Sequence, residues 1–214
     1  MKKFLSALIL IICAYEMNAQ QVICQITGNN IHVKSEYVKP NITALTEDNS
    51  NTSPNTQRII STGFGDITLR FSNEFSEEEM GFNRISISNG NRLLLNIKQD
   101  DNWTYTFGGR SMTDFSQYTS DNYCIPIHMS YYQLLLILCG WPYGGEMPLL
   151  TIIAITPNDA KVIYNRNADI IELSKSPFDM TIQTNIVEYD ADGTPMWDAD
   201  IHRIYYENGK FLYK

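Results

Sequence analysis

The chain of 214 residues is acidic, with 24 Asp and Glu against 16 Lys and Arg and a net charge of −8. Such a charge repels nucleic-acid backbones and anionic lipid surfaces, so no nucleic-acid partner is expected. A partner protein with a basic surface would be attracted, although a negative surface mainly favours solubility.

The first 19 residues have the order of a secretory signal peptide. Two lysines open the chain, an apolar run follows from residue 4 to residue 13, and Ala19 precedes Gln20. The run is too short to span a bilayer, so the chain is not expected to be an integral membrane protein. We expect cleavage after Ala19, export to the periplasm or cell surface, and a single β-rich globular domain over residues 20–214.

Four cysteines are present, and Cys13 falls inside the signal peptide. Lipid attachment there is not favoured, because lipoprotein signals place a small residue before the cysteine and Ile12 is bulky. Of the other three, Cys139 ends an apolar run and has the setting of a buried hydrophobic residue. Three thiols in an oxidising compartment allow one disulfide, so we expect either a Cys24–Cys124 bond or three buried reduced thiols.

Alternation of apolar and polar residues predicts strands along most of the chain. The clearest cases are Asp66–Phe71, residues 103–107 and residues 178–186. One face of each strand is then dry and the other wet, as in antiparallel sheets that cover a core. The expected fold is mainly β with about one helix, its antiparallel strands packed as a sandwich or as a single sheet covered on one face.

Two Asn-Gly pairs predict hairpin turns. Near the C-terminus, a two-residue turn at 208–209 pairs Glu207 with Lys210, so that opposite charges meet across the strands. At 89–90 a two-residue turn would mix apolar and polar faces, so we expect a three-residue loop that pairs Ile87 with Leu93.

One helix is expected between Ser130 and Gly140. Ser130 and Gln133 have the spacing of a capping box, and Gly140 followed by Pro142 stops a helix. Residues 131–139 are apolar on nearly all sides, which indicates burial. The same run also fits a fully buried strand, and we favour the helix.

The sequence contains no recognisable catalytic motif. Its three histidines, His32, His128 and His202, lie far apart, and no nucleophile motif, P-loop or paired C-x-x-C accompanies them. His32 is expected on a wet strand face and His202 at the edge of the core. We assign no catalytic residue and no cofactor, and do not expect an enzyme.

Acidic residues are densest from Glu188 to Asp200. Residues 190–193 resemble the start of a calcium loop, but the third ligand and the distal glutamate of an EF-hand are missing. We therefore expect a solvated turn shaped by Gly193 and Pro195 and assign no metal-binding residue, with a calcium site as the alternative.

Trp141 and Tyr143 are the candidate binding residues. They lie in a Gly- and Pro-rich segment, 141–145, where large amphipathic side chains are often exposed. Exposed Trp and Tyr provide stacking surface for sugars and anchor points for partner proteins. The alternative is that Trp141 folds back to plug the core.

These features favour an exported, non-catalytic binding protein, in its sharpest form an inhibitor or immunity-type protein that binds a protein partner. The alternatives are a small hydrolase of envelope polymers, glycan or peptidoglycan, and a glycan-binding module that uses Trp141 and Tyr143. A hydrolase needs convergent titratable groups in a cleft, a glycan binder an aromatic platform, and an inhibitor a protruding loop or flat patch. Partner identity and oligomeric state have no signature in the sequence.

Overall fold

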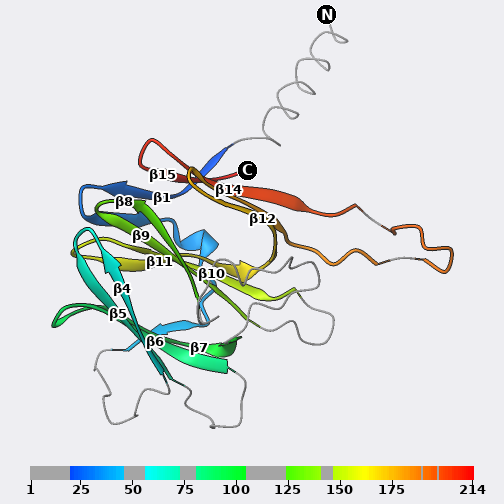
Figure 1. Cartoon of the computed structure of the whole chain (residues 1–214). Coiled ribbons are helices and arrows are strands. Elements are labelled where there is room, and N and C mark those ends of the chain that lie inside the picture. Colours follow the sequence, from blue (N-terminus) through cyan, green and yellow to red (C-terminus); the bar gives the residue numbers. More distant parts are fainter. Residues whose placement is uncertain are drawn as a thin grey trace, which may run out of the picture.

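The computed structural model describes residues 20–45, 56–72, 81–104, 124–140, 147–188, 190–196 and 198–214. These residues form three antiparallel sheets, which Figure 1 shows stacked as layers. The mainly β, antiparallel architecture is confirmed, with one sheet more than a sandwich has. The expected signal peptide, residues 1–19, lies outside the described residues.

The strands fall into sheets of six, four and five. The six-stranded sheet has the order β12-β13-β14-β15-β1-β2, with β1 Gln21–Thr27, β2 Asn30–Val33, β12 Asp169–Lys175, β13 Phe178–Gln183, β14 Ile201–Glu207 and β15 Lys210–Tyr213. The four-stranded sheet has the order β11-β10-β9-β8, with β8 Ile125–Ser130, β9 Gln133–Cys139, β10 Leu149–Ile155 and β11 Ala160–Asn167. The five-stranded sheet has the order β3-β7-β6-β5-β4, with β3 Ile42–Ala44, β4 Thr56–Thr62, β5 Gly65–Ser72, β6 Gly81–Asn89 and β7 Arg92–Thr104.

The helical content of the described ranges is a single 3-10 turn, η1, at Ser35–Tyr37. No helix in those ranges has the length and hydropathy of a membrane span. The prediction of one helix between Ser130 and Gly140 is therefore wrong. These residues belong to the middle layer of the fold.

The four-stranded sheet is that middle layer, and its side chains alternate between two hydrophobic cores. In β9, Leu135 and Ile137 pack in the core shared with the six-stranded sheet. Leu134, Leu136 and Leu138 pack in the core shared with the five-stranded sheet. Every residue of β10 is buried for the same reason. A strand with a core on each face loses the alternation of wet and dry positions that marks most antiparallel strands.

Two-sided burial explains why the run before Gly140 resembled a helix. The run forms β9, which pairs with β8 on one side and with β10 on the other, so the alternative of a fully buried strand is confirmed. Apolar side chains on all sides fit this strand as well as they fit a buried helix. Ser130 pairs with Gln133 across the turn between β8 and β9, so the spacing of the supposed capping box marks a hairpin turn.

The C-terminal hairpin is confirmed in its turn and its register. Asn208 and Gly209 have φ values of 50° and 79°, as a primed two-residue turn requires. Glu207 pairs with Lys210, and Tyr206 pairs with Phe211 in the next position. Local residue preferences were enough to predict this element.

The hairpin between β6 and β7 differs from the expected one. A two-residue turn brings Asn89 opposite Arg92. A bulge beyond the turn then places Ile87 opposite Leu95, where the expected three-residue loop would have placed Leu93. The extra residue of the bulge brings the apolar side chains of β6 and β7 onto the same face. We had expected a three-residue loop to do this.

Trp103 lies near the end of β7 and connects two layers through buried hydrogen bonds. Its side chain is fully buried, and Nε1 donates to Thr151 Oγ1 at 2.8 Å. Thr151 in turn donates to Asn165 Oδ1, and Asn165 Nδ2 donates to Asn41 Oδ1. This polar chain links the five-stranded sheet, the middle sheet and the segment before β3.

The Cys24–Cys124 disulfide is not formed. Cys24 is a buried free thiol in the core beside the six-stranded sheet, whereas Cys124 belongs to the core on the other face of the middle sheet. Burial raises the pKa of Cys24 to about 12, so this thiol is protonated and unreactive at neutral pH. Cys139 is buried as well, as its apolar setting predicts.

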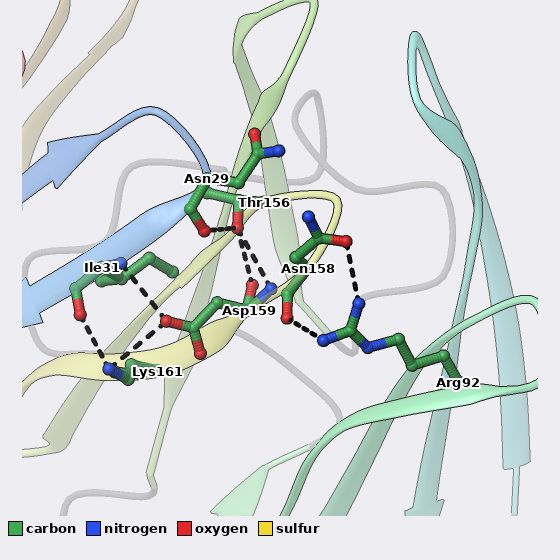
Figure 2. A network of polar contacts seen from close by, with 7 residues as sticks. All are labelled: Asn29, Ile31, Arg92, Thr156, Asn158, Asp159 and Lys161. Atoms are coloured by element: carbon green, nitrogen blue, oxygen red, sulfur yellow. Dashed lines mark hydrogen bonds and ion pairs between the residues drawn. The ribbon is translucent and has the colours of Figure 1, made fainter.

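The turn between β10 and β11 holds the β1–β2 hairpin, as Figure 2 shows. Thr156 Oγ1 donates to the Asn29 carbonyl at 2.7 Å. The Ile31 amide donates to the Asp159 carboxylate at 3.2 Å, and Lys161 Nζ donates to the Ile31 carbonyl at 2.8 Å. The ammonium of Lys161 also pairs with Asp159 at 3.3 Å. The middle sheet is thereby tied to the six-stranded sheet.

The same turn holds the β6–β7 hairpin on the opposite layer. The Arg92 guanidinium donates to the side chain of Asn158 at 2.8 Å and to its carbonyl at 2.9 Å. Asn89 Nδ2 donates to the Pro157 carbonyl at 3.2 Å. One turn of the middle sheet therefore connects all three layers (Figure 2).

Thr156→Val should lower the free energy of unfolding by about 1–3 kcal/mol, because it leaves the Asn29 carbonyl without its donor while side-chain volume is nearly kept. Urea denaturation measures the change. The control is Thr43→Val on the exposed face of β3, expected within about 0.5 kcal/mol of the parent. Equal effects of the two substitutions would show that the turn does not hold the layers together.

Candidate functional site

A pocket of about 670 Å³ opens between the six-stranded sheet and β11, the edge strand of the middle sheet. Its walls come from η1 and the residues after it, the end of β11, the residue after β13, and parts of β14 and β15. Val38 forms a parallel bridge with Asn165, and the Lys39 amide donates to the Asn165 carbonyl at 3.2 Å. The connection after η1 is thus held against the edge of β11 and closes one side of the pocket.

His202 and Asp200 form a hydrogen-bonded pair on the wall made by the six-stranded sheet. Nε2 of His202 lies 3.0 Å from Oδ1 of Asp200, and Thr184 Oγ1 donates to the other carboxylate oxygen at 2.8 Å. The Thr184 hydrogen bond, and then His202, lower the pKa of Asp200 below its ordinary value. Asp200 is therefore an anion at neutral pH and orients the imidazole.

Three tyrosines and His202 form a cluster of packed rings. The centroid of the Tyr213 ring lies 4.7 Å from His202, 5.5 Å from Tyr37 and 6.4 Å from Tyr164. The guanidinium carbon of Arg166 lies 5.5 Å from the Tyr37 centroid, within the range of a cation–π interaction. The rings therefore pack against one another in the absence of a ligand, and they come from η1, β11, β14 and β15.

Tyr164 carries the least satisfied polar group of this cluster. Its side chain is fully buried, and its hydroxyl has no hydrogen-bond partner within the described ranges. The Tyr37 hydroxyl, by contrast, donates to Gln21 Oε1. Burial raises the pKa of Tyr164 above its ordinary value, so the hydroxyl keeps its proton at neutral pH. It can therefore donate a hydrogen bond to an acceptor.

Arg166 and Lys39 bring positive charge to the pocket. Arg166 Nη2 donates to the backbone carbonyl of Glu36, and Lys39 Nζ donates to Asn167 Oδ1. Both acceptors are neutral, and neither cation forms an ion pair with a carboxylate in the part of the chain that the structure describes. The Glu36 side chain also lines the pocket, so the lining contains charges of both signs.

The structure brings one of the three histidines to the pocket. His202 lines it and is partly buried, as expected for an imidazole at the edge of the core. His32 and His128 are exposed on β2 and β8, away from the lining. Trp141 and Tyr143, the candidate binding residues of the sequence, lie outside the described residues.

The acidic segment that begins at Glu188 forms the expected turn. Asp190 Oδ1 accepts hydrogen bonds from the amides of Asp192 and Thr194, each at 2.9 Å. The carboxylate therefore stabilises its own turn, a common role for aspartate. Within the described ranges, no group of three or more His, Cys, Asp or Glu side chains has the arrangement of a metal site.

Sequence reasoning missed the residues that define the pocket, Tyr164, Arg166 and Lys39. They become neighbours only when the connection after η1 lies against β11, so no short spacing marks them. One signal was present: residues 164–167, Tyr-Asn-Arg-Asn, are polar although Asn165 is fully buried. Polar residues that end a core strand indicate either a buried network or a site.

A second exposed feature lies at the turn between β8 and β9. Tyr131 and Tyr132 are 65% and 57% exposed, and their ring centroids lie 4.8 Å apart. The Tyr131 ring covers Gly63, where an added Cβ would lie 2.5 Å from a ring atom. Exposed tyrosines are typical anchors of protein interfaces.

Tyr164→Phe should raise the free energy of unfolding by about 1 kcal/mol, since it removes a buried hydroxyl that has no partner. The matched control, Tyr37→Phe, should lower it by a similar amount because that hydroxyl is hydrogen-bonded. Chemical denaturation at pH 7 compares the two. A loss of stability in Tyr164→Phe would mean that its hydroxyl already has an acceptor.

Stability should fall as pH rises from about 9 to about 12. Burial raises the pKa of Cys24 from 9.0 to about 12 and that of Tyr213 from 10.0 to about 12. The unfolded chain therefore binds fewer protons than the folded chain in this interval, and the free energy of unfolding declines with pH. Denaturation at pH 8, 10 and 11 measures the decline, which should be shallower in Tyr213→Phe. A free energy of unfolding that is the same at these three pH values would contradict the raised pKa values of Cys24 and Tyr213.

Comparison of the chain with protein-family models, with curated proteins and with solved structures finds no match. The roles of the pocket residues are therefore inferred from their own geometry and chemistry.

Proposed function

We propose that this protein is an exported, non-catalytic binding protein and that the pocket between the six-stranded sheet and β11 holds its ligand. The observation that carries the proposal is Tyr164, a residue of the pocket lining whose buried hydroxyl has no partner in the described part of the chain. Such a group is satisfied when a ligand or an ordered water supplies an acceptor. Concave sites with a few convergent polar groups are typical of small-molecule binding.

The packing of the lining also supports binding. Tyr213 stacks on His202, and His202 is fixed by Asp200. Arg166 is held by a hydrogen bond to the Glu36 carbonyl and by the Tyr37 ring. Because these side chains are already ordered, a ligand that enters loses little affinity to the ordering of the site.

The arrangement around His202 favours binding over catalysis. A nucleophilic mechanism needs a hydroxyl or thiol hydrogen-bonded to the imidazole, and the Thr184 hydroxyl donates to Asp200 instead. Both oxygens of Asp200 are engaged, and its lowered pKa makes it a poor proton donor near neutral pH.

Export rests on residues 1–19, whose order of basic, apolar and small residues is that of a signal peptide. The binding function would then operate in the periplasm or at the cell surface. Envelope components and partner proteins are the molecules available there.

Native mass spectrometry tests the proposal on protein purified after export from cells that express the full chain. The intact mass should correspond to a chain that begins at Gln20. Mixing with a pool of small molecules and oligosaccharides extracted from the host envelope should give a saturable adduct whose ligand is released chemically unchanged. Arg166→Met should lose the adduct, whereas Lys210→Met, at the other end of β15 and outside the lining, should keep it.

The second candidate function is a hydrolase of envelope polymers, and the His202–Asp200 pair inside the pocket favours it. In this mechanism Asp200 would orient His202, and the imidazole would act as a general base. The same experiment separates the two functions. Shortened oligosaccharides or peptides that appear with the parent and disappear with His202→Gln would establish the hydrolase and refute the binding protein.

An inhibitor-type function would use a convex surface rather than the pocket. The exposed pair Tyr131 and Tyr132 is the described feature that suits a protein partner, and the acidic chain favours a basic one. A glycan-binding function through Trp141 and Tyr143 would act on residues outside the described ranges.

A further inference from the structure

Two cations in the pocket lining, Arg166 and Lys39, have no carboxylate partner within the described ranges. Some described cations have a carboxylate partner: Arg203 Nε donates to Asp179 at 2.6 Å, and Lys161 pairs with Asp159 at 3.3 Å. Arg166 and Lys39 have neutral acceptors only, within the described ranges. Because no carboxylate is bonded to them, both cations keep donors for an anion that enters the pocket.

The two carboxylates of the lining, Asp200 and Glu36, are not bonded to these cations. Asp200 uses both of its oxygens, one on His202 and one on Thr184. Glu36 lines the pocket, but the contact between Glu36 and Arg166 is made by its backbone carbonyl. The guanidinium therefore keeps donors that a planar, negatively charged acceptor can engage.

The aromatic rings of the pocket are not arranged as a platform for a sugar ring. Tyr213 already packs against His202, Tyr37 and Tyr164, and the guanidinium of Arg166 lies over Tyr37. A platform for stacking leaves ring faces open to the ligand. Polar and charged groups are therefore the recognition elements that this pocket offers.

The Tyr164 hydroxyl belongs to the same group of donors. It is fully buried, unpartnered within the described ranges, and carried by the strand that carries Arg166 two residues later. An oxyanion that accepts hydrogen bonds from a hydroxyl, a guanidinium and an ammonium gains charge-assisted hydrogen bonds, which are shorter and stronger than neutral ones. The same anion would supply the acceptor that Tyr164 lacks.

We infer that the ligand of this pocket is a small molecule with an oxyanion group, a carboxylate or a phosphate, bound by Arg166, Lys39 and Tyr164. The inference rests on the proposed binding function and names the chemical class of the ligand. Arg166 supplies planar recognition of two oxygens, Lys39 a point charge and Tyr164 a neutral donor. The His202–Asp200 pair and Tyr213 also line the pocket.

Three probes that share one ring separate charge from shape: D-glucose, D-glucuronate and D-glucose 6-phosphate. Each is titrated into the exported protein in phosphate-free buffer, and the backbone amide shifts of residues 36–39 and 164–167 are followed by NMR. The two anions should shift these amides saturably at concentrations where glucose does not. The tighter of the two anions identifies the source of the oxyanion as a carboxylate or a phosphate.

Variants assign the effect to the named residues. Arg166→Met should weaken binding of the preferred anion about tenfold or more, the effect of losing a charge-assisted hydrogen bond pair. Tyr164→Phe should weaken it several-fold even though it stabilises the unliganded protein, a combination that a purely structural tyrosine would not show. Lys210→Met removes an equal charge outside the lining and should leave the affinity within about twofold.

Two results would overturn the inference. Glucose that binds as tightly as the anions, with no effect of Arg166→Met, would show a neutral ligand and would leave the proposed binding function standing. If the amides of the pocket respond to none of the three probes, the inference that the ligand carries an oxyanion group is refuted. The adduct with the envelope pool tests the binding function separately.

Discussion

The burial of the middle sheet on both faces is the constraint on which the rest of the structure depends. Leu135 and Ile137 of β9 fill one core while Leu134, Leu136 and Leu138 fill the other, so the same strand supports both outer sheets. Burial stabilises the fold by roughly 25 cal/mol for each Å² of apolar area removed from water. A strand of the middle sheet buries apolar area on both faces, whereas an ordinary strand buries it on one. The outer sheets, by contrast, bury one face each and keep the alternating pattern, as β5 and β13 show. The turn at residues 156–159 then fixes the layers in register through polar contacts rather than through more apolar area.

The pocket follows from this layering. β11 is the edge strand of the middle sheet, and its last residues line the pocket together with parts of β14 and β15. The connection after η1 covers that edge through Val38 and Lys39, which leaves a concave space instead of an open strand edge. Tyr164 and Arg166 of β11 meet His202 of β14 there. Their neighbours Asn165 and Thr151 extend the same polar strand end into the hydrogen bonds that anchor Trp103. The end of β11 therefore both lines the pocket and takes part in the hydrogen bonds that hold the layers together.

The sequence was informative where structure is decided locally. The turn at Asn208-Gly209, the alternation in β5 and β13 and the solvated turn at Asp190 depend on residues within a few positions of one another, and all were predicted. It was misleading where burial comes from distant parts of the chain: β9 resembled a helix because a second core removes its wet face, and the register of β6 with β7 depended on a bulge. Of the two alternatives for the cysteines, the Cys24–Cys124 bond is not formed for the same reason, since only the layering places the two thiols in different cores. The pocket had almost no sequence signature, because Lys39, Arg166 and His202 are far apart along the chain.

Hydrogen exchange measured residue by residue on the exported protein tests the central claim most directly. If the middle sheet is the shared support of both cores, the amides of β9 and β10 exchange only through global unfolding and are the slowest of the described residues. The strands at the edges of the outer sheets, β2, β3, β4 and β12, then exchange through local opening with smaller free energies. Amides of β9 and β10 that exchange as fast as those edge strands, while an outer sheet stays protected, would contradict the account, because the outer sheets would then fold without the layer that is meant to carry them.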